Sequence, residues 1–304
     1  MSKAMRDMFW DRIHEEMKDD PQIFVLTADF GAPALDRIAA DFPDRFVSVG
    51  ISEQNLVNVA AGLALEGRRV IAYAIAPFFL RCAEQIRINL AMTNQFRPMN
   101  VTLVGVGVGF SYVVSGPSHH ALEDLSVLHN FPGLRIITPS DSFSAGAAAE
   151  LTRQPGLRYL RFDSQVLPDI YDDKFRFPDC GYTVLRKGGK NPAVLIGSGA
   201  MTGIALQIAE RLPDCKVIDL FDPDVDLRAE LADCSRIYTM EEGVLGRGGV
   251  DSSIRQACME KKVTGFGFSG LYEFTARSRE ALRQSFGLTA EQIADRIRED
   301  LKHE

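Results

Sequence analysis

The chain is poor in the residues that build metal or disulfide frameworks. Its 304 residues include only five cysteines and five histidines, and no two cysteines have Cys-x-x-Cys spacing. Neither a zinc site nor a disulfide-stapled fold is therefore predicted, and a reducing cytoplasm is the simplest expected location. No apolar run reaches the length of a membrane span, and the polar N-terminus lacks a signal-peptide pattern.

An excess of positive charge is also absent. The sequence has 34 lysines and arginines against 41 acidic residues, which gives a net charge of −7. This balance argues against a nucleic-acid partner or an acidic membrane surface and suits a soluble enzyme. A hydrophobic content of 46% and a length of 304 residues are enough for two domains with cores of their own.

What the first half contains is an alternation of short apolar strands and longer helices. Strands are predicted over 23–27, 46–49, 70–73, 101–106, 134–137 and 157–160, and helices over 5–17, 53–65, 78–93 and 142–152. The alternation predicts a parallel sheet with helices on both faces. Ligands of such sheets gather at the carboxyl ends of the strands, where Asp29, Gly50 and Gly107 fall.

The second half repeats this pattern after a stretch of broken periodicity. A first domain over 1–165, a linker over 166–180 and a second domain over 181–304 are expected. The second domain has predicted strands over 193–196, 217–220, 237–240 and 263–268, and predicted helices over 202–212, 249–260 and 277–286. Thr289 and Gln292 form a capping-box pattern for a final helix. The fold class is α/β, with two doubly wound domains.

Two patterns in the second domain imitate functional sites. Gly-Ser-Gly at 197–199 and the strand-ending Asp219 resemble a dinucleotide fingerprint, but the third glycine is displaced to Gly203. Nicotinamide or flavin binding is therefore not predicted. Glu241 and Glu242 are interpreted as part of a strand-end turn and not as a metal site.

Glu53 is the residue around which the functional argument is built, at the junction of strand 46–49 and an apolar helix. Its ordinary explanation is that it offsets the helix macrodipole. Other motifs follow it in order: Gly-Ile-Ser-Glu-Gln-Asn at 50–55, Ala-Ala-Gly-Leu-Ala at 60–64, Pro-Phe-Phe at 77–79, Gly-Pro-Ser-His-His at 116–120 and Thr-Pro-Ser-Asp at 138–141. Together they resemble the pyrimidine-binding half of the transketolase family. The resemblance continues through a transketolase C-terminal-type domain to about Phe274.

The resemblance implies thiamine diphosphate as cofactor. Glu53 matches the family's activating glutamate, whose carboxylate faces a ring nitrogen of the aminopyrimidine. Phe78 matches the aromatic residue that stacks on this ring, and Phe79 and Ile51 are expected beside it. Asp29 matches an acidic residue near the cofactor in relatives. Core packing is the structural alternative for the two phenylalanines, and a loop or capping role is the alternative for Asp29.

The resemblance also implies substrate-binding residues. His119 matches the family position that passes protons to substrate oxygens, and His120 stands where glutamine is common. Ser115 occupies the place of an acidic residue that contacts an acceptor hydroxyl. Arg158 and Arg161 are expected on one side of a strand and match arginines that hold a substrate phosphate. Surface ion pairs are the alternative for both arginines.

One family motif is missing. Transketolases bind magnesium and diphosphate through Gly-Asp-Gly followed by a later asparagine, and this chain has no Gly-Asp-Gly. We therefore expect half of a split enzyme, in which a separate N-terminal-type subunit carrying Gly-Asp-Gly…Asn supplies the Mg²⁺ ligands. No metal ligand is expected from this chain. A heterotetramer with this chain as a homodimer core is the expected assembly.

The expected activity is transfer of a two-carbon ketol (or acyl) unit from a ketose or 2-oxo acid to an aldehyde. The strand end at 103–107, Leu-Val-Gly-Val-Gly, lacks the polar pair of housekeeping transketolases, so a more apolar pocket and a specialised substrate are expected. Three alternatives remain open: a 2-oxo-acid dehydrogenase β subunit, a deoxyxylulose-phosphate-synthase-like enzyme and a non-catalytic scaffold subunit.

Overall fold

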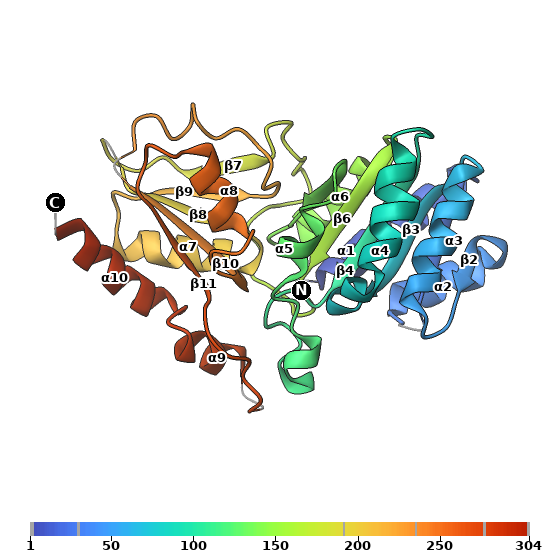
Figure 1. The fold of residues 1–304 in the computed structure, drawn as a ribbon, viewed down its shortest axis with the longest axis horizontal. Coiled ribbons are helices and arrows are strands. Elements are labelled where there is room, and N and C mark those ends of the chain that lie inside the picture. Colours follow the sequence, from blue (N-terminus) through green and yellow to red (C-terminus); the bar gives the residue numbers. More distant parts are fainter. Residues whose placement is uncertain (1–2, 29–30, 191, 235, 276–277, 303–304) are drawn as a thin grey trace.

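The computed structural model describes residues 3–28, 31–190, 192–234, 236–275 and 278–302, and these form two α/β domains that lie side by side (Figure 1). The first domain is built on a six-stranded, wholly parallel sheet in the order β2-β1-β3-β4-β6-β5. Its strands are β1 (Ile23–Thr27), β2 (Phe46–Ser48), β3 (Arg69–Ile75), β4 (Asn100–Val106), β5 (Leu134–Ile137) and β6 (Gly156–Phe162). The predicted parallel sheet is confirmed.

Helices cover both faces of this sheet because successive strand side chains point to opposite sides. One face packs against α1 (Met5–Asp19), α2 (Pro33–Asp41) and α6 (Ser142–Leu151). The other packs against α3 (Glu53–Leu65), η2 (Ala76–Cys82), α4 (Ala83–Gln85), η3 (Ile86–Met92) and α5 (Asp124–Leu128). Three short 3₁₀ turns complete the domain: η1 (Pro43–Arg45), η4 (Val113–Ser115) and η5 (Pro117–His119).

The prediction of a single regular helix over 78–93 is wrong, because three helical segments of different type occupy this region. The segment begins earlier, as the 3₁₀ helix η2, passes through one α-turn and continues as the π-helical η3. Pro77 lies in the first turn of η2, where its missing amide costs nothing. Irregular helices of this kind frequently mark functional sites, and this one follows β3 at the carboxyl edge of the sheet.

The second domain carries a five-stranded mixed sheet in the order β11-β10-β8-β9-β7. Its strands are β7 (Tyr182–Arg186), β8 (Val194–Gly197), β9 (Lys216–Leu220), β10 (Ile237–Val244) and β11 (Val263–Phe268). Its helices are α7 (Ala200–Arg211), α8 (Val250–Ala257), α9 (Arg279–Ser285) and α10 (Ala290–Lys302). Strand β7 pairs antiparallel to β9 and was not predicted, since its half-buried edge position leaves no continuous apolar run.

Other predicted boundaries shift. Helix α8 ends at Ala257 and not at 260, and β10 runs through Glu241 and Glu242, so these residues are strand and not turn. The capping box of α10 is confirmed. The backbone amide of Gln292 donates to the Thr289 hydroxyl at 3.3 Å, and the backbone amide of Thr289 donates to Oε1 of Gln292 at 3.4 Å.

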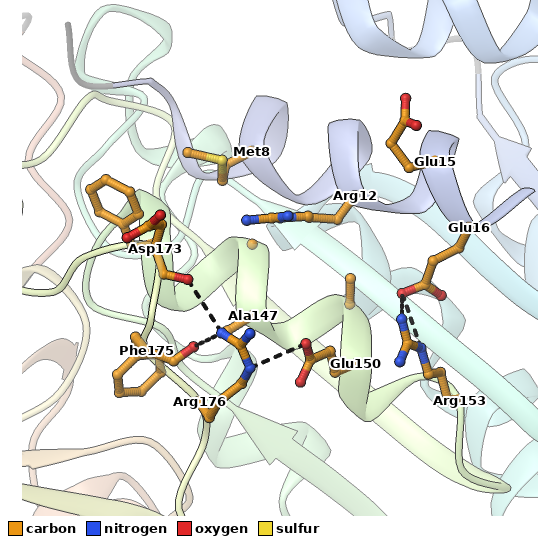
Figure 2. Close-up of a pocket in the computed structure, with 13 residues that line it drawn as sticks. Met8, Arg12, Glu15, Glu16, Ala147, Glu150, Arg153, Asp173, Phe175 and Arg176 are labelled. Atoms are coloured by element: carbon orange, nitrogen blue, oxygen red, sulfur yellow. Dashed lines mark hydrogen bonds and ion pairs between the residues drawn. The ribbon is translucent and has the colours of Figure 1, made fainter.

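The stretch 163–181 between the sheets contains no helix or strand. Part of it packs back on the first domain, where it closes a pocket of about 170 Å³ with α1 and α6 (Figure 2). There Arg176 forms an ion pair of 3.4 Å with Glu150, and Arg153 forms one of 3.0 Å with Glu16. The pocket lies on the α1/α6 face, opposite to α3.

Buried polar contacts join the two domains. Phe110 and Glu242 meet where the Phe110 amide donates to Oε2 of Glu242 at 3.0 Å. The preceding Gly109 has φ +60°, and a side chain there would collide with Glu242. Arg279 bridges Asp163 at 2.6 Å and Glu242 at 2.7 Å. Buried ion pairs and hydrogen bonds therefore hold the two domains together, in addition to apolar contacts.

Candidate active site

Glu53 lies at the first position of α3, just beyond the carboxyl end of β2. Only 5% of the residue is exposed. Its Oε2 accepts a hydrogen bond of 3.1 Å from Nη1 of Arg81, and no described residue bonds to Oε1. A carboxylate oxygen that has no partner among the described residues is available to a ligand at this edge of the sheet. Ile51, two residues earlier, is 79% exposed.

The aromatic pair on η2 divides between site and core. Phe78 is half-buried, its face carries the Arg81 guanidinium 4.3 Å from the ring centroid, and its ring lies 5.4 Å from that of His119. Phe79 is fully buried and packs edge-on against Tyr159 in the core. The expectation that Phe79 contacts the cofactor is therefore wrong, because its ring points into the sheet.

The two histidines also differ. His119 is half-buried, and its Nδ1 lies 3.0 Å from the Ser118 hydroxyl. His120 is only 4% exposed and packs edge-on against Phe110, and its Nε2 has no hydrogen-bond partner among the described residues. Burial lowers the pKa of His120, so the neutral ring is favoured near pH 7. Gly116, with φ +74°, provides the turn that opens this loop.

Ser115 lies at the end of η4, in the loop that carries the histidines. Its substrate contact stays a prediction. The prediction for Asp29 falls outside the described residues.

The expectation for the arginines is wrong in part. Residues three apart on a strand point to opposite faces, so Arg158 and Arg161 do not share a side. Arg158 lies near the amino end of β6, where its guanidinium donates to backbone carbonyls and to Oδ1 of Asn100 at 3.1 Å. It is thus remote from the carboxyl edge that carries Glu53.

Arg161 is closer to that edge but is already paired. Its guanidinium makes two hydrogen bonds of 2.8 and 2.9 Å with Asp124, and the Tyr159 hydroxyl donates to the same carboxylate at 2.9 Å. All three side chains are buried. A substrate phosphate would have to displace Asp124, so a structural role fits Arg161 better.

The aspartate of the dinucleotide-like pattern in the second domain is already hydrogen-bonded within the protein. Asp219 is fully buried and accepts hydrogen bonds from the hydroxyls of Thr202 at 2.7 Å, Ser140 at 2.6 Å and Tyr171 at 2.8 Å. Because Asp219 is fully buried behind these three hydroxyls, a ribose cannot reach its carboxylate. This arrangement ties β9 to the first domain and to the connecting stretch.

Sequence reasoning missed Arg81, which contacts both Glu53 and Phe78. Its position three residues after Phe78 on a helical segment was the available signal, since such residues share a face. Across the described residues, no three His, Cys, Asp or Glu side chains are grouped so as to hold a metal ion. None of the described helices combines the length and apolar character needed to cross a bilayer.

Residues Glu53, Phe78 and His119 follow β2, β3 and β4, so three strand ends at one edge of the sheet present a carboxylate, an aromatic face and an imidazole to one region. Residues 1–168 match the transketolase pyrimidine-binding domain. The chain belongs to the transketolase family. The resemblance carried by the motifs is thus confirmed.

Individual members of the family align with nearly the whole chain. The chain is 30% identical over 313 residues to an apulose-4-phosphate transketolase subunit of Actinobacillus succinogenes, covering 97% of this chain and 98% of the relative. It is 27% identical over 310 residues to a 6-deoxy-6-sulfo-D-fructose transketolase subunit of a Clostridium species, covering 95% and 92%. A 1-deoxy-D-xylulose-5-phosphate synthase of Leifsonia xyli is 30% identical over 301 residues, which span 94% of this chain but 45% of that enzyme.

Solved structures of the family have the same fold. A protein described as a split gene transketolase, inactive beta4 tetramer, superposes with a TM-score of 0.85 at 27% identity, covering 98% of both chains. A transketolase from Pichia stipitis superposes with a TM-score of 0.80 at 16% identity, covering 97% of this chain and 45% of that one. The second likeness concerns the fold alone.

Proposed function

We propose that this chain is the pyrimidine-binding subunit of a split transketolase that uses thiamine diphosphate to transfer a two-carbon ketol unit to an aldehyde. The observation that carries the proposal is the buried Glu53 carboxylate, with Oε1 free of described partners, at the carboxyl edge of a transketolase pyrimidine domain. Phe78 and His119 lie beside it. These residues fit an aminopyrimidine ring, which needs an acceptor at its edge and an apolar face.

In this proposal each residue has a distinct task. When bound, thiamine diphosphate supplies an acidic ring carbon whose conjugate base can attack a carbonyl group. Glu53 would share a proton with the pyrimidine nitrogen through a charge-assisted hydrogen bond, which a dry pocket would strengthen. Phe78 covers the ring face and excludes water, with Ile51 at the rim. His119 and the neutral His120 hold or move a proton at a substrate oxygen.

The rest of the cofactor site belongs to a second polypeptide. We infer that a partner with Gly-Asp-Gly…Asn binds Mg²⁺ and the diphosphate, and that two copies of each chain form a heterotetramer. Two of the relatives are themselves named as transketolase subunits, which supports this inference. The split-gene neighbour, described as an inactive beta4 tetramer, supports it as well. A sugar or a 2-oxo acid is the proposed donor.

Reconstitution tests the proposal. The chain is mixed with the Gly-Asp-Gly subunit, Mg²⁺ and thiamine diphosphate, and ketol transfer between sugars is followed. We expect each subunit alone to be inactive and the mixture to be active. Glu53→Gln should lower turnover by about 10²-fold or more, since it removes an interaction with developing charge. The control Glu84→Gln, on the exposed start of the neighbouring helix, should keep full activity.

The same assay separates the alternatives. Acyl transfer to lipoamide in place of an aldehyde would indicate a 2-oxo-acid dehydrogenase subunit. Carbon dioxide release from pyruvate with glyceraldehyde 3-phosphate would indicate a deoxyxylulose-phosphate-type synthase, an option supported by relatives at 30% identity. Unchanged turnover of the Glu53→Gln complex would leave only a scaffold role.

A further inference from the structure

A groove of about 530 Å³ lies between the histidine loop of the first domain and a segment of the second. The segment, residues 271–274, follows β11 and reaches across to the first domain near the 3₁₀ turns after β4 (Figure 1). We call it the aromatic arm. The groove is lined by Pro117, Ser118, His120 and Glu123 from the loop side and by Tyr272 and Phe274 from the arm.

The groove contains an unsatisfied polar group. His120 is only 4% exposed and lines the groove, and its Nε2 has no partner among the described residues. Its ring is held edge-on by Phe110 at 5.5 Å, so the imidazole has a fixed direction. Buried polar atoms are satisfied in nearly all native structures, by protein, water or ligand. Nε2 itself is covered, so a hydroxyl or carbonyl group that bonded to it would have to enter from the groove beside the ring.

The opposite wall combines aromatic faces with hydroxyl chemistry. Phe274 is 82% exposed and Tyr272 is 49% exposed, which is unusual for two large aromatic side chains beside a pocket. The Tyr272 hydroxyl donates to the Glu123 carboxylate across the domain boundary. Phe268 stacks on Tyr272 at 6.0 Å and supports the arm from within the second domain. Tyr272 thus anchors the aromatic arm to the first domain, whereas the side chain of Phe274 is exposed to solvent.

These groups match the two surfaces of a sugar chain. The C–H faces of a polyhydroxylated carbon chain pack on aromatic rings, while its hydroxyls both donate and accept hydrogen bonds. Glu123 can accept from a hydroxyl, Ser118 can do either, and neutral His120 offers one ring nitrogen. An aliphatic ligand would leave these polar groups unpaired, which binding sites penalise.

The groove also adjoins the reaction region. Its wall includes Pro77 on η2, next to Phe78, and Pro117 and Ser118, next to His119. Phe78 and His119 are in ring contact at 5.4 Å. A substrate whose carbonyl lies beside His119 would extend its remaining carbons along this groove.

We infer that the groove binds the hydroxylated tail of the sugar substrate and that Tyr272 and Phe274 of the second domain determine how long a tail is accepted. The inference rests on the proposed ketol transfer. It assigns a substrate-contacting role to the second domain. Short acceptors end before the arm, and longer ones reach it.

The test compares acceptors of increasing length in the assembled complex. For Phe274→Ala, and separately for Tyr272→Phe, KM for ribose should rise about tenfold, while KM for glycolaldehyde and the dissociation constant of thiamine diphosphate should stay unchanged. Met259→Ala is the matched control, since Met259 is 85% exposed on the same domain and does not line the groove. An equal rise of KM for both acceptors, or weaker subunit association, would overturn the inference.

A direct binding measurement keeps this test separate from the proposed reaction. Saturation-transfer difference NMR of ribose with the assembled complex needs no turnover. The signal should fall in Phe274→Ala and persist in Met259→Ala. Equal signals in both variants would refute the groove assignment. Absence of ketol transfer in the wild-type complex would instead refute the proposed function, and the NMR comparison would still decide the groove.

Discussion

Replacement of Arg279 by methionine should destabilise the protein strongly, because this residue joins the domains through buried charge. Its side chain is 8% exposed and donates to Oδ2 of Asp163 at 2.6 Å and to Oε2 of Glu242 at 2.7 Å. Asp163 follows β6 and Glu242 lies in β10. The substitution leaves two buried carboxylates with too little compensating charge.

The magnitude follows from the cost of breaking a buried pair. Burial alone would raise the pKa of Glu242, but the charges of Arg279 and Arg283 outweigh it and lower that pKa to about 2. Removing one partner of a buried ion pair typically costs about 3–5 kcal/mol. Arg283 still donates to Glu242 at 2.6 Å, so the lower end applies. An unfolding entropy of about 2.1 cal/mol/K per residue, taken over the 304 residues of this chain, converts about 3 kcal/mol into a fall of roughly 5 °C in melting temperature.

Thermal unfolding followed by circular dichroism measures the effect. The pKa of Glu242 lies below the ordinary value, so its stabilising contribution is present above about pH 4.5 and is lost as the pH falls toward 2. The difference between wild type and Arg279→Met should therefore be largest near pH 7 and shrink in acid. The control Arg228→Met removes an exposed pair with Asp226 and should leave the melting temperature unchanged. A loss below about 1 kcal/mol for Arg279→Met at pH 7 would refute the reasoning.

Three further outcomes are expected. Burial raises the pKa of Glu241 to about 7, above the ordinary value, so wild-type stability should fall as the pH rises from about 4.5 to 7, and Glu241→Gln should flatten this slope in urea unfolding. Phe79→Ala should cost about 3–5 kcal/mol of unfolding free energy by calorimetry, since its ring fills the core. Phe78→Ala should cost far less stability but weaken thiamine diphosphate binding in the assembled complex, measured by titration calorimetry. A larger loss of stability for Phe78→Ala than for Phe79→Ala would contradict the assignment of Phe78 to the site and of Phe79 to the core.

The sequence predicted those elements whose boundaries depend on local signals. Strands 23–27, 134–137 and 263–268 and helix 53–65 match the structure at both ends, because apolar runs or periodicity stop at clear breaks. Helix α2 was missed although Pro33 stands at its first turn. The irregular course of η2 to η3 was also missed, since tertiary packing and not periodicity sets it.

The candidate site was likewise predicted where it depends on local motifs and missed where it depends on tertiary contacts. Glu53, Phe78 and the histidine loop stand in local motifs that the sequence displays. The pairings of Arg81 with Glu53 and of Tyr272 with Glu123 join residues far apart in sequence, and no local pattern announces them. The common face predicted for the two β6 arginines failed for a local reason, because three residues along a strand reverse the side-chain direction.

The connecting stretch 163–181 joins two domains that share a buried core, and this limits what happens when the chain is cut between them. Apolar side chains of both domains, among them Leu134, Leu231 and Ile254, belong to one continuous buried cluster. A protease that cut the stretch would therefore leave two halves that still adhere. A gene that encoded only the first half would expose the apolar side chains of this cluster to water, so the first domain alone should be less soluble than the whole chain.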